Sequence, residues 1–102
     1  MTNHIDTTPQ FDDWLDGVKD PLGRGAINGR ILRAAGGNFG DTEPVGEGLS
    51  ETRVFVGPGY RIYFVRAGTN RYVILYGSGK SDQARGIRRA KEILNTLRGK
   101  QS

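Results

Sequence analysis

Residues 51–83 constrain the fold more than any other part of the chain, because they predict two consecutive β-hairpins. Strand-like runs at 52–56 and 60–66 flank the sequence Gly57-Pro58-Gly59, and glycine tolerates the positive φ that tight turns require. A second turn near Gly68-Thr69 leads into another strand-like run. We therefore expect three strands, near 51–57, 60–67 and 71–77, in a mainly antiparallel sheet.

Alternation along these strands sorts their side chains onto two faces. If 57–59 form the loop, Val56 opposes Tyr60, so that one face is apolar and the other basic and aromatic. The apolar face is expected to hold Val54, Val56, Ile62, Phe64, Val73 and Leu75, and the second face Arg53, Phe55, Arg61, Tyr63, Ile74 and Tyr76. Arginines interleaved with aromatic rings suit phosphates and unstacked bases, so we expect function on the second face.

Helical patterns flank the predicted hairpins on both sides. Thr8-Pro9 and Asp20-Pro21 each place a capping side chain before a proline, which predicts helices near 9–19 and 21–35. A short strand near 4–8, a loop at 38–49 and a final helix near 82–98 complete the chain. The order predicts one α+β domain over 1–102, with the apolar face of the sheet against the two N-terminal helices.

Basic residues are concentrated in the second half of the chain. Residues 53–102 contain eleven basic and two acidic residues, whereas residues 1–52 contain four basic and nine acidic ones. This asymmetry indicates a polyanion or an acidic protein as partner, and a merely solvated basic surface is the alternative. No apolar run approaches the ~20 residues of a membrane span, and no signal peptide is recognisable, so we expect a cytoplasmic protein with no membrane partner.

Several catalytic and cofactor sites are excluded by composition or spacing. The chain has no cysteine, which rules out disulfides and thiol catalysis. The run 77–81 (Gly-Ser-Gly-Lys-Ser) lacks the first glycine of a nucleotide-binding loop, because that position is Ile74. His4 is the single histidine, so a two-histidine ribonuclease mechanism is impossible. We expect no metal and no small-molecule cofactor.

Several segments taken together resemble a known family. They are Asn38-Phe39-Gly40-Asp41, Val45-Gly46-Glu47-Gly48, Glu51-Thr52-Arg53, Gly57-Pro58-Gly59-Tyr60-Arg61-Ile62-Tyr63, the run 77–83 and the helix start Phe11-x-x-Trp14-Leu15. In these segments the chain is similar to the HigB-like addiction-module killer proteins of the RelE/ParE superfamily, which are toxins of bacterial type II toxin–antitoxin systems. The resemblance implies two helices on an antiparallel sheet and a cognate helix-turn-helix antitoxin.

The resemblance also implies an activity, which differs between branches of the superfamily. Many members cleave mRNA on the ribosome, whereas ParE-type members poison DNA gyrase. Three positions depart from the family pattern: Gly79 and Gly86 replace acids, and Thr52 replaces a leucine. A decayed, non-enzymatic toxin homologue that binds its antitoxin is therefore a third reading.

Cleavage of RNA through its 2′-hydroxyl needs a base, a cation for the phosphorane charge and an acid for the leaving oxygen. RelE-like enzymes supply these groups without a histidine pair. By this resemblance the catalytic candidates are Arg61 as phosphate clamp, Arg53 beside it, Lys80 as base or acid, and Tyr63. The candidates for RNA binding are Phe55, Tyr76, Arg85, Arg88 and Arg89. For Arg53 the alternative is a structural ion pair with an acid from the N-terminal half.

Overall fold

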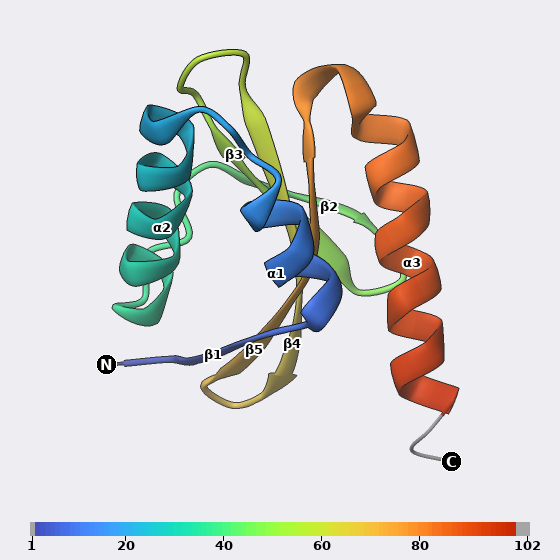
Figure 1. The fold of residues 1–102 in the computed structure, drawn as a ribbon. Coiled ribbons are helices and arrows are strands. Elements are labelled where there is room, and N and C mark those ends of the chain that lie inside the picture. Colours follow the sequence, from blue (N-terminus) through green and yellow to red (C-terminus); the bar gives the residue numbers. More distant parts are fainter. Residues whose placement is uncertain (1, 100–102) are drawn as a thin grey trace.

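A five-stranded sheet runs through the middle of the protein and carries helices on both faces (Figure 1). The computed structural model describes residues 2–99. Its elements are β1 (His4–Thr7), α1 (Pro9–Asp16), α2 (Pro21–Ala35), β2 (Thr42–Gly46), β3 (Leu49–Val54), β4 (Tyr60–Gly68), β5 (Arg71–Gly79), a 3₁₀ turn (Lys80–Asp82) and α3 (Gln83–Gly99). The strand order is β1-β5-β4-β3-β2, with β1 parallel to β5 and the other pairs antiparallel. The predicted α+β class is confirmed.

Both N-terminal helices begin where their capping signals predict. The Thr8 hydroxyl accepts a hydrogen bond from the N–H of Phe11 at 3.0 Å, and Pro9 is the first residue of α1. Asp20 caps α2 in the same way, through the N–H of Leu22 at 3.1 Å. These local signals do not depend on the rest of the fold, which is why the sequence reveals them.

The hairpin between β3 and β4 has a longer loop than we predicted. Arg53 opposes Arg61 and Val54 opposes Tyr60, so the loop covers 55–59 and the register differs from the prediction by two residues. Because the side-chain period of a strand is two, this shift leaves the predicted faces of β3 and β4 intact.

The predicted faces of β5 are largely wrong. Ile74 opposes Phe64 and Val73 opposes Val65, so Val73 and Leu75 face α3 whereas Ile74 faces the N-terminal helices. The pairing of β4 with β5 is irregular between Tyr63 and Phe64 and again between Arg66 and Gly68. Each irregularity shifts the alternation by one residue, and sequence alternation alone does not reveal such shifts.

The sheet therefore separates two hydrophobic clusters. On the face of α1 and α2, the buried residues are Phe11, Ile27, Val54, Tyr60, Ile62, Phe64 and Ile74. On the face of α3, they are Leu49, Tyr63, Val65, Leu75, Ala90, Ile93 and Leu94. The second face is thus largely covered by α3, and only its upper end remains for the predicted basic, aromatic surface (Figure 1).

Strand β2 lies inside the segment that we expected to be a loop. It is one of the two edge strands of the sheet and pairs with β3, with Glu43 opposite Glu51. Its sequence Thr-Glu-Pro-Val-Gly contains a proline and shows no apolar alternation, which explains why the strand was missed. β2 matters for the site because it brings the acids of this segment next to β3.

Candidate functional site

A buried carboxylate organises the upper end of the sheet. The Glu51 side chain on β3 has no exposed surface. Its Oε2 accepts hydrogen bonds from Nη1 of Arg61 at 2.6 Å and from Nε of Arg53 at 3.1 Å. Nε2 of Gln83, the first residue of α3, donates to Oε1 at 3.1 Å. One acid thus ties together β3, β4 and α3.

Arg61 is held firmly and lies close to the surface. Its side chain is 14% exposed, and Nη1 is fixed by Glu51. Its Nε is buried and has no hydrogen-bond partner among residues 2–99. A buried donor without a partner costs free energy. The salt bridge with Glu51 offsets part of that cost and holds the guanidinium in place.

Arg53 is surrounded by acids. Besides Glu51 it pairs with Asp41 at 3.1 Å and with Glu43 on β2. These hydrogen bonds, that of Asp41 first, raise the pKa of Arg53 above its ordinary value. The structure thus contains the ion pair that was the alternative for Arg53. Three acids balance the charge of this guanidinium, whereas Arg61 pairs with Glu51 alone among the described residues.

A shallow hollow collects four of the predicted residues. Arg53, Phe55, Arg61 and Lys80 all line it, together with Val54, Gly59 and Tyr60. Phe55 is 74% exposed, and Lys80 is exposed at the start of the 3₁₀ turn, where its backbone N–H donates to the carbonyl of Gly59 at 3.1 Å. The hollow therefore combines a cation on a flexible stem, a fixed guanidinium and an exposed aromatic ring.

Tyr63 lies outside this hollow. It is fully buried under α3, and its hydroxyl is 2.8 Å from Oγ of Ser78. Burial raises the pKa of Tyr63. The structure thus places this catalytic candidate in the core, without exposed surface that RNA could contact.

Gly86 explains how α3 comes so close to the sheet. A Cβ at this position would lie 2.7 Å from Cβ of Ser78 and 2.9 Å from the ring of Tyr63. An acidic side chain, which the HigB-like toxins that the sequence resembles commonly have here, does not fit this packing. The close contact of α3 with β5 therefore explains why glycine stands at position 86, where the family pattern has an acid.

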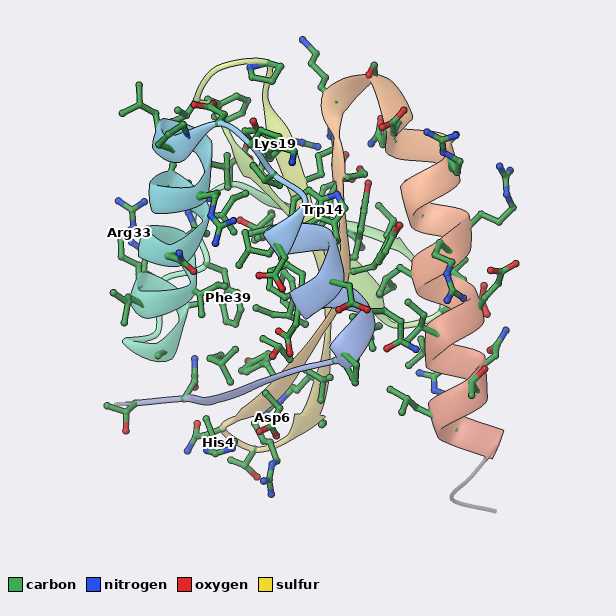
Figure 2. The ribbon with its side chains drawn as sticks, in the orientation of Figure 1. His4, Asp6, Trp14, Lys19, Arg33 and Phe39 are labelled. Carbon is green, nitrogen blue, oxygen red and sulfur yellow. The ribbon has the colours of Figure 1, made fainter. Side chains whose placement is uncertain are left out.

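Thr52 has a similar local explanation. Its hydroxyl donates to the carbonyl of Phe39 at 2.5 Å and accepts from Nη1 of Arg30 at 2.7 Å. Arg30 also donates to the carbonyl of Arg53 at 2.6 Å. These hydrogen bonds form a polar network that links three parts of the chain: α2, the segment that precedes β2, and strand β3. In addition, the ring of Phe39 stacks on the ring of Phe64, with centroids 4.5 Å apart (Phe39 is labelled in Figure 2).

The remaining RNA-binding candidates lie elsewhere. Tyr76, Arg85 and Arg89 line a second hollow, between α1 and α3, with Trp14 on its other side (labelled in Figure 2). Arg88 is exposed on α3 and forms no ion pair within the described residues. Four of the predicted residues thus line the hollow around Arg61, three line the hollow beside Trp14, and Tyr63 and Arg88 lie in neither.

Glu51, Ser78 and Gln83 were not predicted as site residues. Glu51 alternates with Arg53 and Phe55 and therefore lies on the basic, aromatic face of its strand. An acid at such a position was the sequence signal that could have identified it. His4 pairs with Asp6 on β1, at the end of the sheet opposite the β5–α3 turn (Figure 2). Residues 2–99 contain no cluster of three or more His, Asp or Glu side chains suited to a metal ion.

Comparison with known proteins identifies a relative of this chain. No family model matches it. An uncharacterized protein of Haemophilus influenzae is 39% identical over 97 residues, which are 95% of this chain and 98% of the relative. The two proteins belong to one family. Because the match covers nearly all of both chains, we take the fold described above to be common to this family. No helix among the described residues of this family member is long and apolar enough to cross a membrane.

Proposed function

We propose that this protein is the toxin of a bacterial type II toxin–antitoxin system and a metal-independent endoribonuclease that cleaves mRNA on the ribosome. The observation that carries the proposal is the hollow in which Arg61, fixed by the buried Glu51, lies with Lys80 and Phe55. The α+β fold and the motifs that resemble HigB-like toxins support it. We place its action in the cytoplasm, where mRNA is translated.

The chemistry requires one cation at the scissile phosphate and a second group that handles a proton. In our proposal Arg61 donates to the phosphate oxygens and stabilises the charge of the phosphorane. The 2′-oxygen bonds to phosphorus while its proton passes to solvent, and the bond from phosphorus to the 5′-oxygen breaks. Lys80 gives its proton to that oxygen. Phe55 provides a surface on which a base stacks.

Arg53 and Glu51 have supporting roles in this proposal. Glu51 accepts from both arginines and so fixes the guanidinium of Arg61 before RNA arrives, which lowers the ordering cost of binding. Arg53 links Glu51 to Asp41 and Glu43 and holds β2 against β3. We therefore assign the contact with the phosphate to Arg61 and Lys80 ahead of Arg53.

The test combines growth with transcript mapping. Induced expression should stop growth, and the 5′ ends of cellular mRNA should show new cuts within translated regions. Lys80→Ala should remove both effects, whereas Arg33→Ala, an equal loss of charge on an exposed part of α2, should leave them. Intact transcripts with failing DNA supercoiling would overturn the ribonuclease assignment in favour of a gyrase poison. Normal growth would favour a non-enzymatic homologue.

The proposed partner is a helix-turn-helix antitoxin encoded by the adjacent reading frame. Residues 53–102 hold eleven basic and two acidic residues, so we expect an acidic segment of the antitoxin to cover part of this half. Co-expression of that neighbour should restore growth. The affinity should fall markedly as salt is raised, since exposed charge pairs are screened within about 10 Å at 0.1 M. An affinity that does not change with salt would mean that the contact is mainly apolar.

A further inference from the structure

The hollow beside Trp14 has an aromatic wall whose position is fixed. It lies where α1 and α3 both pack on β5 (Figure 1; Trp14 is labelled in Figure 2). The indole rests on Gly77, where a Cβ would lie 2.4 Å from the ring. The rings of Phe11 and Tyr60 pack beside it, with centroids 5.8 and 6.3 Å away. Trp14 is nevertheless only half-buried, so the hollow offers a planar apolar surface that is in place before any ligand arrives.

Two polar groups of the aromatic residues in this hollow have no partner. Within residues 2–99, the indole N–H of Trp14 and the hydroxyl of Tyr76 form no hydrogen bond, and neither atom is buried. The hydroxyl of Ser78, in contrast, is already engaged, 2.8 Å from the hydroxyl of Tyr63 and donating to the carbonyl of Gly79 at 3.1 Å. The polar groups that the hollow can offer a ligand therefore lie on Trp14 and Tyr76, where acceptor atoms of the ligand can bind.

α3 adds two guanidinium groups to the hollow. Arg85 and Arg89 are four residues apart on this helix and so lie on the same side of it. Arg85 pairs with Asp82, which also lines the hollow, at 2.9 Å, and Arg89 pairs with Glu92 at 3.5 Å. All four side chains are exposed, and such ion pairs contribute little to stability. A phosphate, which accepts from a guanidinium in bidentate fashion, can therefore compete with these acids for both arginines.

We propose that the hollow beside Trp14 binds one nucleotide, free or within an RNA strand. Its base lies against Trp14 and Tyr76, and its phosphate accepts from Arg85 and Arg89. The volume of the hollow, about 250 Å³, is close to the lower end of the ~300–1,000 Å³ of ligand pockets, so it suits one nucleotide and excludes a dinucleotide. The hollow shares no residue with the hollow around Arg61, so this binding does not depend on the proposed cleavage.

The test is an NMR titration of the complete protein with adenosine monophosphate. Trp14 is the single tryptophan of the chain, so its indole N–H gives one assignable resonance within the hollow. This resonance should shift saturably. Adenosine, which lacks the phosphate, and ribose 5-phosphate, which lacks the base, should each bind about tenfold more weakly. A five-residue oligoadenylate distinguishes the two sources: tighter binding than the monophosphate indicates a site for RNA, and equal or weaker binding indicates a site for the free nucleotide.

Matched variants separate this site from general attraction to a basic protein. Arg85→Gln and Arg89→Gln should each weaken binding of the monophosphate about tenfold and leave that of adenosine unchanged. Arg33→Gln, the same change on an exposed part of α2, should leave both unchanged. Lys80→Ala should also bind as the parent does, so a protein without ribonuclease activity still tests the site. Equal binding of ribose 5-phosphate and the monophosphate, an equal effect of Arg33→Gln, or no saturable shift with either the monophosphate or the oligoadenylate would overturn the proposal.

Discussion

Nη1 of Arg61 donates a hydrogen bond of 2.6 Å to Oε2 of Glu51, a carboxylate with no exposed surface. Arg53 and Gln83 donate to the same carboxylate. A buried charge is tolerated only while its partners remain, so the pair should matter for the stability of the fold as well as for the proposed activity. Stability and activity can be measured separately.

Glu51→Gln should lower the free energy of unfolding by about 3 kcal/mol, because it leaves two partly buried guanidinium groups without their shared countercharge. Urea denaturation measures the change. The control is Glu92→Gln, which removes an acid from an exposed pair with Arg89 and should change stability by less than about 0.5 kcal/mol. A loss below about 1 kcal/mol for Glu51→Gln would mean that Arg53 and Arg61 find sufficient partners in Asp41 and Glu43.

Two glycine-to-alanine substitutions should act in opposite directions. Gly77→Ala places a Cβ 2.4 Å from the ring of Trp14 and should destabilise the protein by about 2 kcal/mol through overpacking. Gly25→Ala, within α2, meets no atom within 4 Å and should stabilise it by up to about 1 kcal/mol. Thermal and urea unfolding of both variants test the pair. Stabilisation by Gly77→Ala would show that Trp14 does not rest on β5.

Stability should fall at alkaline pH partly because of Tyr63. Burial raises its pKa in the folded state above the ordinary value of 10.0. The folded protein therefore keeps this proton while the unfolded chain loses it, so the contribution is complete below pH 10.0 and is lost as pH rises through the folded pKa. Urea midpoints between pH 8 and 11 should decline less steeply in Tyr63→Phe than in the parent. Tyr60→Phe provides a second case of the same effect, because burial also raises the pKa of Tyr60. Parallel curves for the parent and Tyr63→Phe would contradict the prediction.

Lys80→Ala should reduce mRNA cleavage by about 10²–10³ without changing stability measurably. The side chain is exposed, so its removal leaves no cavity, whereas a charged group acting on the transition state contributes about 3–4 kcal/mol. Single-turnover cleavage of a defined mRNA on purified ribosomes measures the rate, and urea unfolding measures the stability. A rate equal to that of Arg33→Ala, a loss of charge on the exposed side of α2, would remove Lys80 from the mechanism.

Arg61 is a less clean probe than its strand position suggested. A side chain that projects from a sheet face can usually be truncated without harm to the fold, which would favour Arg61→Ala as a test of activity. In the structure its guanidinium neutralises a buried carboxylate, so truncation removes both a phosphate contact and a structural partner. For this reason the activity prediction is placed on Lys80.

Local chemistry determined what the sequence alone could predict. The caps at Thr8 and Asp20 depend on a side chain and a backbone N–H a few residues apart, so both helix starts were correct. The faces of β3 and β4 were also correct, because an error of two residues in register preserves a period of two. Arg53, Phe55 and Arg61 consequently line one hollow, and Lys80 joins them from the 3₁₀ turn after β5.

Only the tertiary structure decided the features that depend on contacts between distant segments. The irregular pairing of β4 with β5 exchanged the faces of Val73 and Ile74, and the packing of α3 buried Tyr63. Pairing of β2 with β3 brought Asp41 and Glu43 to Arg53. Such features arise because a strand takes its register, and a charge its partners, from neighbours that are far away in the sequence, and no local pattern encodes them.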